Sequence, residues 1–438
     1  MVFYIISIIF ILSFMKGVLE LLGIPETFQQ LLIESLIMLL YIYSLLKLVQ
    51  DKKMYGPGFY INSLLIVVIF ISFLITDVNN IQLVLFIRKL LIYYMFFYAV
   101  YNIDFEKEQA DKILTLIKFL FIVQIIGAFV KLGLIGTLEK IVGTMTVQEG
   151  SVATIMPLLA ISYLIAHYLE FKNKKAIIFV FLFIAIGLIS NKLGILFYVM
   201  FLFIFHSYLY SYKHSGTFLN ILFLRKMTMV LVLLVVIFAA FVSLNPRANP
   251  ENKVGGSIDI DYLVQFIDDY QHLQLKGAAA RQEGNGRFEA PFVALDRLSE
   301  RGFLHVLFGL GPGEIIKSSF VAYRDPLLEK YNIGYGGRIG LVWTMMQIGL
   351  IGVMLLVAFH FILFKKVLKL YFSADKNTEK KYLVIILGVL GFIALYFIDY
   401  FSYSKKLLLT PGIVLTYYFL IYYVLVHIKE NITTKDKF

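Results

Sequence analysis

Residues 81–101, IQLVLFIRKLLIYYMFFYAVY, form a long apolar run in which Arg88 and Lys89 are the only charged residues. At a rise of about 1.5 Å per residue, a helix of this length crosses the hydrocarbon core of a bilayer. A cation inside such a helix is costly unless it faces a cavity or a charged partner, so Arg88 is a candidate functional residue. The alternative is that its long side chain reaches the membrane surface, about two helical turns away.

The same apolar character recurs along the chain, which has 60% hydrophobic residues and a mean hydropathy of +0.82. The runs are too long and too uniformly apolar for the alternating strands of a membrane barrel. The sequence therefore predicts an all-α integral membrane protein. We expect about twelve transmembrane helices, near residues 2–22, 28–48, 58–76, 81–101, 112–133, 152–169, 175–190, 193–212, 227–244, 340–364, 382–402 and 408–427.

Lysines are concentrated in alternate loops between the expected spans, as the positive-inside rule describes for cytoplasmic loops. The formal net charge of +11 mostly reflects these lysines, which suit anionic membrane lipids and require no nucleic acid. This bias places both termini in the cytoplasm and a long hydrophilic loop outside the cytoplasmic membrane. The predicted organisation is spans 1–9 in residues 1–244, an external helical loop in 245–339, and spans 10–12 with a cytoplasmic tail in 340–438.

The composition disfavours several kinds of site. The chain has no cysteine, which excludes disulfides, thiol nucleophiles and cysteine metal sites. The external loop also lacks the histidine pairs and repeated aspartates typical of metal sites, so we expect no metal and no cofactor. No convincing internal repeat is present, which argues against a transporter built from duplicated halves.

The external loop contains seven of the nine arginines of the chain, whereas lysine serves nearly everywhere else. Arginine offers a planar, permanently charged fork that grips phosphate oxygens through two hydrogen bonds. The pattern favours binding of a phosphorylated lipid, and the alternative is a polar loop whose charges pair with its own acids. The arginines concerned are Arg247, Arg281, Arg287, Arg297, Arg301, Arg324 and Arg338.

Two parts of the external loop are expected to form helices. Residues 257–275 have the pattern of an amphipathic helix that lies against the membrane or the bundle. Residues 286–302 are expected to form a second helix, with Arg287 at its opening end, Pro291 near its start and Gly302 as its stop. A helix N-terminus presents free N–H groups and a positive dipole end, so Arg287 and this terminus together predict an anion site.

Three turns complete the set of candidate positions. Gly309, Gly311 and Gly313 form a compact turn whose backbone can approach a ligand. Lys192 lies in a tight outward turn after the seventh span, either at the mouth of a cavity or as a surface cation that helps end a helix. The last outward turn contains charged and aromatic residues whose role the sequence leaves open, namely Asp399, Tyr400, Tyr403, Lys405 and Lys406.

Taken together, these features resemble the O-antigen ligase and polymerase superfamily, which contains WaaL-type ligases and Wzy-type polymerases. Four patterns carry the resemblance: an arginine in the fourth span, a Ser-x-basic-x-Gly turn opening the eighth span, an arginine followed by a helix and a glycine turn, and a GLIG-containing span after the external loop. In this chain they are Arg88, the stretch Ser190 to Gly194, the stretch Arg287 to Gly313, and residues 349–352. Their order and sidedness cover essentially the whole chain.

Two departures from the family pattern separate the chain from the ligases. The turn before the eighth span usually carries arginine, where this chain has Lys192. Ligases of the family place a histidine eleven residues before the first glycine of the GLIG-like segment, where this chain has Arg338. A histidine general base therefore cannot be carried over, which favours a polymerase or another divergent member.

The resemblance implies a metal-independent glycosyltransferase of the GT-C type that uses a glycan on undecaprenyl pyrophosphate at the outer face of the cytoplasmic membrane. Catalysis then needs cations for the pyrophosphate leaving group, a positioned acceptor hydroxyl and a base for its proton. The implied pyrophosphate-binding cations are Arg88, Lys192, Arg281, Arg287 and Arg338. The candidate catalytic residues are Arg287 and Arg338, with Glu283, Glu289 and His305 as candidate bases.

Three functional hypotheses follow. The leading one is a polymerase that joins repeat units of a capsule, O-antigen or exopolysaccharide, with a flippase and a chain-length regulator as expected partners. The second is a ligase that moves the glycan to a lipid or protein acceptor. The third is a transporter or flippase for lipid-linked glycans, against which the long external loop argues.

Overall fold

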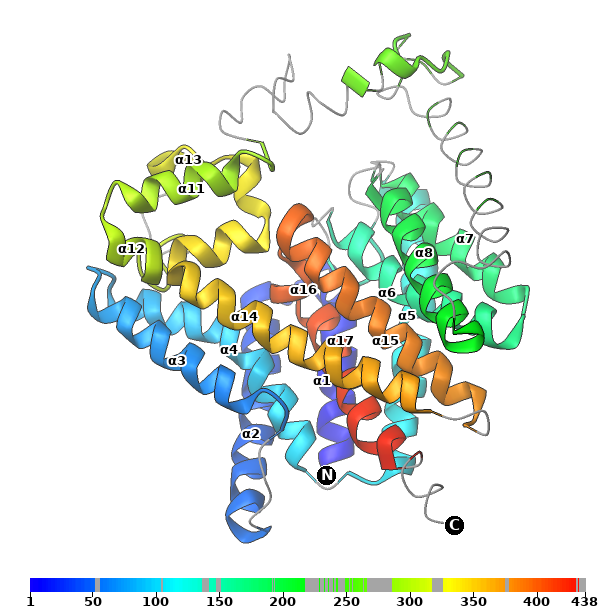
Figure 1. Cartoon of the computed structure of the whole chain (residues 1–438), viewed down its shortest axis with the longest axis horizontal. Helices are drawn as coiled ribbons and strands as arrows, with labels where there is room; N and C mark the ends of the chain where they lie inside the picture. The colour runs from blue at the N-terminus through cyan, green and yellow to red at the C-terminus, as the bar shows by residue number, and fades with distance from the viewer. Residues whose placement is uncertain are drawn as a thin grey trace.

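The computed structural model describes residues 1–51, 56–103, 105–135, 142–146, 151–190, 192, 194–216, 286–316, 326–374, 378–430 and 432, with single residues and short stretches between 228 and 265. All regular structure in these residues is helical (Figure 1). The helices pack around one continuous apolar core. The expectation of an all-α membrane protein is confirmed at this level.

In the described residues, eleven helices coincide with eleven of the twelve expected spans. Of the expected ninth span, 227–244, only isolated residues are described. Two helices continue as π-helical turns, α15 into Asp399–Tyr403 and α17 into Val424–Ile428. The helices are α1 (Val2–Leu21), α2 (Glu26–Asp51), α3 (Phe59–Leu74), α4 (Asn80–Asn102), α5 (Lys107–Ile135), α6 (Val152–Phe171), α7 (Lys175–Ile189), α8 (Gly194–Ser215), α14 (Gly340–Ser373), α15 (Lys380–Ile398) and α17 (Pro411–Tyr423).

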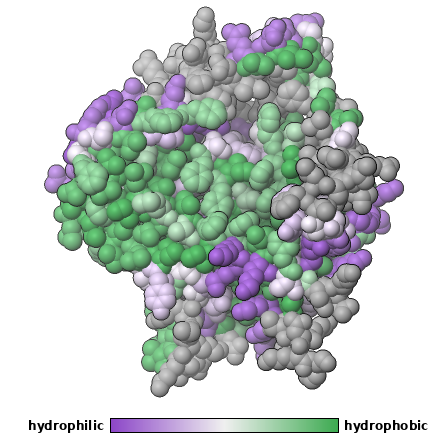
Figure 2. Space-filling view, viewed as in Figure 1, coloured by the Kyte–Doolittle hydropathy of each residue, from purple (hydrophilic) through white to green (hydrophobic). Residues whose placement is uncertain are grey.

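Nine helices within the described part of the chain are long and apolar enough to cross a membrane, while α3 and α7 are apolar but shorter. Large apolar side chains such as Leu39, Leu64 and Phe70 are exposed on these helices, as expected for a surface that faces lipid. Figure 2 shows a broad band of hydrophobic side chains on one face, with hydrophilic side chains above and below it. The protein is therefore a multi-pass membrane protein.

The helix ends form two groups at opposite ends of the bundle. The N- and C-termini lie at one end, and the short helices α11 (Ala290–Ser299), α12 (Phe303–Phe308) and α13 (Pro326–Tyr331) lie at the other (Figure 1). At the end that holds the termini, Lys107 Nζ donates to Tyr382 Oη over 2.6 Å and Lys213 Nζ donates to Ala374 O over 2.8 Å. Lys107 and Lys213, from two different loops, thus lie at the same end of the bundle.

Helix α14 is broken in its first half. Ile348 has φ −131° and ψ 16°, and Gly349 has φ 65° and ψ −171°, a combination that only glycine adopts readily. A Cβ on Gly349 would lie 2.2 Å from Leu307 O of α12. The first glycine of the GLIG segment therefore permits close packing against α12 and also interrupts the helix.

The glycine turn after α12 docks on this break. The carbonyl oxygens of Met346 and Gln347 accept hydrogen bonds from Leu310 N–H (2.8 Å) and Gly311 N–H (3.2 Å). The Gln347 side chain also accepts from Gly313 N–H at 3.0 Å. Backbone groups freed inside a membrane span need such partners, so this docking explains how the break is tolerated.

The predicted helix at 286–302 is present as α11, with Pro291 in its first turn. Its buried side chains are Ala290, Ala294 and Leu298, whereas Phe292 is 71% exposed. The two alanines allow α11 to pack closely on the bundle, and Phe292 faces away from it. The other expected helix, 257–275, is described only to residue 265, and its residues 260–262, 264 and 265 are helical.

A short non-helical segment, residues 142–146, is buried between α1 and α5. Gln124 of α5 accepts from Thr144 N–H (2.8 Å) and donates to Thr144 Oγ1 (2.6 Å). Lys131 Nζ donates to the carbonyl oxygens of Val142 (2.9 Å) and Thr146 (2.7 Å). Irregular backbone persists among membrane helices only where it is satisfied by protein or lines a polar cavity, and both conditions are met here.

Candidate functional site

A polar cavity of about 680 Å³ opens at the end of the bundle far from the termini. Its walls come from α1, α2 and α4, from the buried segment 142–146, and from the turn that leads into α17. The cavity combines residues that are nearly four hundred positions apart. Its lining consists of Ser13, Lys16, Glu26, Thr27, Gln30, Glu34, Leu85, Arg88, Lys89, Tyr93, Met145, Thr146, Ile316, Lys405, Lys406, Leu409, Thr410 and Pro411.

The lining carries an excess of positive charge. Five basic side chains face two acidic ones, Glu26 and Glu34, which leaves a formal charge of three positive units (five minus two). Because low-dielectric walls weaken screening, such a cavity attracts anions more strongly than an exposed patch of the same charge. The basic residues are Lys16, Arg88, Lys89, Lys405 and Lys406.

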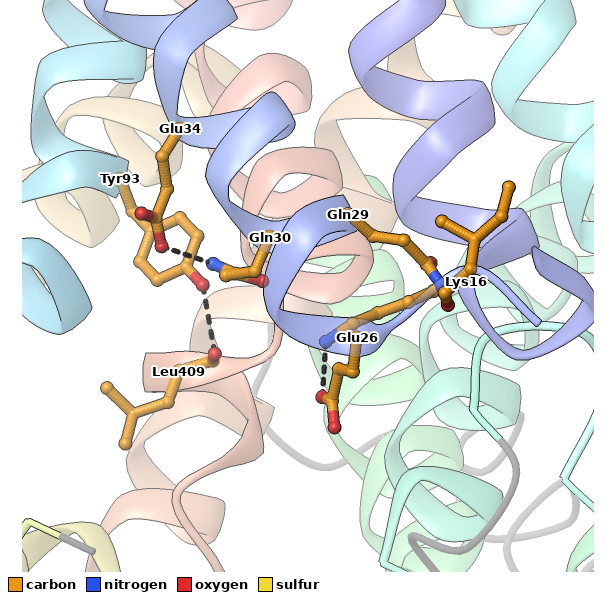
Figure 3. A network of polar contacts seen from close by, with 8 residues as sticks. Lys16, Glu26, Gln29, Gln30, Glu34, Tyr93 and Leu409 are labelled. Carbon is orange, nitrogen blue, oxygen red and sulfur yellow. Dashed lines mark hydrogen bonds and ion pairs between the residues drawn. The ribbon is translucent and has the colours of Figure 1, made fainter. Parts of the chain in front are cut away.

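Arg88 has both an acidic partner and access to the cavity. Its Nε lies 2.5 Å from Glu34 Oε2, and the side chains are 32% and 8% exposed respectively. Glu34 also accepts a hydrogen bond of 2.7 Å from Gln30 Nε2 (Figure 3). The pair accounts for a charge inside the fourth span without requiring its side chain to reach the membrane surface.

A second ion pair joins α1 to the start of α2. Lys16 Nζ lies 2.6 Å from Glu26 Oε1, with the lysine 14% and the glutamate 61% exposed (Figure 3). On the opposite wall, Tyr93 Oη donates to Leu409 O at 2.9 Å and so fixes α4 against the entry to α17. These contacts give the cavity a defined shape.

The outward turn after α15 is organised around the buried carboxylate of Asp399. That carboxylate accepts hydrogen bonds from Ser404 Oγ (2.5 Å) and Leu407 N–H (3.0 Å). Ser404 Oγ accepts in turn from Lys406 N–H at 3.2 Å. The sequence leaves the role of this turn open, and the structure shows that it brings Lys405 and Lys406 to the cavity.

The first turns of two long helices also contribute to the cavity wall. α2 begins at Glu26, and α17 begins at Pro411 with Thr410 as its N-cap residue. The N-terminus of a helix carries a partial positive charge and N–H groups that lack partners within the helix. Both termini therefore add to the preference of the cavity for an anion.

Arg287 lies next to this turn but is not part of the cavity lining. Its Cζ is 4.7 Å from the centroid of the Tyr403 ring, a cation–π arrangement. Tyr403 is itself fixed by a 2.8 Å hydrogen bond between its hydroxyl and Thr154 Oγ1. Arg287 therefore connects the external helix α11 to the same turn that carries Lys405 and Lys406.

Two further predicted cations lie outside the cavity. Arg338 is exposed and precedes α14 by two residues; there, Gly340 N–H donates to Ser404 O at 3.0 Å. Lys192 is partly buried, and its backbone N–H donates to Gly187 O at 2.9 Å at the end of α7. Of the predicted pyrophosphate-binding residues, Arg88 alone lines the cavity among those that the structure describes.

The residues predicted as bases are also away from the cavity lining. Glu289 is the N-cap residue of α11, and its carboxylate accepts from Gly286 N–H at 3.4 Å. His305 lies on α12. Arg281 and Glu283 fall outside the described residues. The described carboxylates that do line the cavity are Glu26 and Glu34.

The predicted glycine turn makes its close approaches to the protein itself. Gly309, Gly311 and Gly313 all have positive φ values. Added Cβ atoms would lie 2.5 Å from the Gln347 backbone, 2.3 Å from Val78 and 2.1 Å from the Gln82 backbone respectively. Within the described residues, the turn thus anchors α11 and α12 to α14, to the connection between α3 and α4, and to the first turn of α4.

Several cavity residues were not among the predicted site residues. Glu34 and Lys16 are charges within the second and first spans, and a charge inside a span is the signal that singled out Arg88. Lys405 and Lys406 lie in the turn whose role could not be predicted from the sequence. Applying the intramembrane-charge criterion to every span would have found the first two.

In the part of the chain that the structure describes, no group of three histidine, cysteine, aspartate or glutamate side chains is placed to hold a metal ion. Comparison of the chain with models of known protein families and with curated proteins finds no match.

Proposed function

We propose that this protein is a polymerase that joins lipid-pyrophosphate-linked oligosaccharide repeat units at the outer face of the cytoplasmic membrane. The observation that carries the proposal is the cationic cavity of about 680 Å³ between membrane helices. A pyrophosphate-linked lipid has its negative charge at the membrane surface and its apolar chain in the bilayer. A polar, positively charged cavity bounded by apolar helices suits such a molecule.

In this mechanism the cavity cations stabilise the leaving group. As the bond between the sugar and the pyrophosphate breaks, negative charge develops on the pyrophosphate oxygens, and preorganised cations stabilise that charge without reorganising. Arg88 provides a planar fork, and Lys405 and Lys406 provide point charges from the facing turn. The proposal thus assigns charge neutralisation, the role that a metal ion has in other transferases, to side chains of the chain itself.

The acceptor sugar supplies a hydroxyl group that must lose a proton as it attacks. Glu34 and Glu26 are the described carboxylates at the cavity, and we assign the proton to one of them. Binding of pyrophosphate beside Arg88 would compete with Glu34 for the guanidinium and leave the carboxylate better able to accept a proton. Arg287, held against Tyr403, is placed to bind the glycan or phosphate that enters from the external helices.

The proposal can be tested by transfer assays with purified protein. Lipid-linked repeat units, extracted from cells that lack this protein, are incubated with the wild type and the products are separated by length. A ladder of products supports a polymerase. A single transfer to another lipid or to protein supports the ligase hypothesis, and movement of the lipid across vesicles without transfer supports the flippase hypothesis.

Variants connect the activity to the cavity. Arg88→Ala should lower the rate of transfer by about 100-fold or more, as loss of one transition-state charge partner commonly does. Arg297→Ala is the matched control, because Arg297 pairs with Glu300 on the exposed surface of α11 and is not part of the cavity. Equal rates for Arg88→Ala and Arg297→Ala at matched amounts of folded protein would refute the role of the cavity.

A further inference from the structure

A second, chemically different groove lies among α5, α6, α7, α15 and α17, with a volume of about 210 Å³. Its lining is apolar except at one place, where Lys118 and Tyr163 meet. Ile122 and Phe179 in its wall are 45% and 41% exposed, so the groove is open at the surface that faces lipid. The other lining residues include Phe121, Leu159, Ala160, Phe183, Gly388 and Phe392.

Lys118 and Tyr163 form the polar part of this groove. Lys118 Nζ lies 5.0 Å from the centroid of the Tyr163 ring. Neither the ammonium nor the phenol hydroxyl forms a hydrogen bond or an ion pair with another described residue. The groove therefore presents an ammonium group and a hydroxyl group that can both donate to one anion.

The position of Lys118 along α5 requires an explanation. It stands eleven residues after Lys107, which is about 16 Å along the helix axis. A lysine at this depth is costly without an anionic partner or access to the interface. Side chains of a helix lean toward its N-terminus, and α5 begins at the end of the bundle that holds the chain termini. Lys118 thus points toward the lipid headgroups of that leaflet.

We propose that this groove binds one anionic phospholipid, with its phosphate on Lys118 and Tyr163 and one acyl chain in the apolar part. The groove continues from Lys118 past Phe121 and Leu159 toward the middle of the bilayer, which is the direction an acyl chain takes from its headgroup. An anionic headgroup is preferred because the site offers a cation and has no acidic lining residue that would hold a zwitterionic headgroup's ammonium.

The lipid site is separate from the cationic cavity. The groove uses α5, α6, α7, α15 and Leu420 of α17, whereas the cavity uses α1, α2, α4, the turn before α17 and the first residue of α17. The two have no lining residue in common. The proposal therefore does not depend on the function of the cavity. Its test measures lipid binding and needs no transfer activity.

The experiment is native mass spectrometry of the purified full-length protein with phosphatidylglycerol or phosphatidylcholine of identical acyl chains. We expect the wild type to retain phosphatidylglycerol about fivefold more than phosphatidylcholine, the factor expected when one lysine contacts an anionic headgroup. Lys118→Ala should remove this preference. Lys112→Ala is the matched control on the same helix, because Lys112 pairs with Glu108 at the surface and is not in the groove.

A second variant tests the acyl-chain part of the site. Ala160→Phe should fill the groove and lower retention of both lipids, and Ala160→Leu offers a smaller change if the phenylalanine variant does not fold. Size-exclusion chromatography checks the fold of each variant. Equal retention of the two lipids by the wild type would overturn the proposal. So would unchanged retention by a folded Ala160 variant, because the lysine would then act only as a surface charge.

Discussion

Arg88 and Glu34 form an ion pair that compensates the charge of each residue inside a membrane span. Neither residue alone would be stable at this depth, because an unpaired charge loses its hydration without compensation. Their 2.5 Å ion pair keeps the guanidinium partly open to the cavity and the carboxylate almost fully buried. The ion pair with Glu34 thus holds Arg88 in place beside the cavity.

This pairing predicts an asymmetric response to mutation. Arg88→Ala should lower the free energy of unfolding by roughly 1 to 3 kcal/mol, between the values for exposed and for fully buried pairs, since Arg88 is 32% exposed. Adding Glu34→Gln should restore part of the loss, because the neutral amide no longer needs a cation. Denaturant unfolding in detergent of the two single variants and the double variant measures the coupling. Strict additivity would show that the two side chains do not interact.

At the scale of elements, the break in α14 is what couples the short helices α11 and α12 to the membrane bundle. Gly349 breaks the helix, and the glycine turn after α12 supplies N–H groups to the carbonyls of Met346 and Gln347. The external helices are therefore attached to α14 through backbone hydrogen bonds. Arg287 adds a second attachment through the Tyr403 ring.

The break predicts a large effect of a small substitution. Gly349→Ala should destabilise the protein by about 2 to 4 kcal/mol, because φ is 65° and the new Cβ would lie 2.2 Å from Leu307 O. Gly133→Ala in α5 is the control, since no atom lies within 4 Å of its added Cβ. That change should be neutral or stabilising by up to about 1 kcal/mol. Thermal unfolding of both variants in detergent is the measurement, and an equal melting temperature would contradict the account.

At the scale of the whole molecule, the two ends of the bundle have different chemistry. The end with the termini gathers lysines that bind backbone carbonyls and tyrosines, whereas the opposite end gathers the cationic cavity and the external helices. This polarity agrees with a cytoplasmic end and an outer end. The proposed lipid groove belongs to the first end and the proposed transfer site to the second.

The absence of cysteine allows a direct test of this orientation. Ser299→Cys in α11 and Ser373→Cys at the end of α14 are exposed positions at opposite ends of the bundle. A membrane-impermeant maleimide added to intact spheroplasts should label position 299, while position 373 should react only after permeabilisation. Labelling in the reverse order would invert the topology and remove the outer-face assignment.

The sequence by itself determined the positions of most of the helices along the chain. A lipid-embedded backbone must satisfy its own hydrogen bonds, so an apolar run of sufficient length can be read as a helix without knowledge of its neighbours. Local signals were also sufficient at α11, because Pro291 marks the start of this helix and Gly302 marks its stop. Arg88 could also be singled out, because the cost of a charge in a span depends mainly on its depth.

The tertiary structure decided which charges meet. Lys16, Arg88 and Lys406 are brought together by the packing of α1, α4 and the turn before α17, and no local pattern encodes that packing. The external arginines were favoured from the sequence because arginine suits phosphate, yet Arg338 is exposed and Arg287 stacks on Tyr403. The type of a residue determines what its side chain can bind. The position of that side chain in the packed bundle determines whether it lies in the same cavity as the other cations.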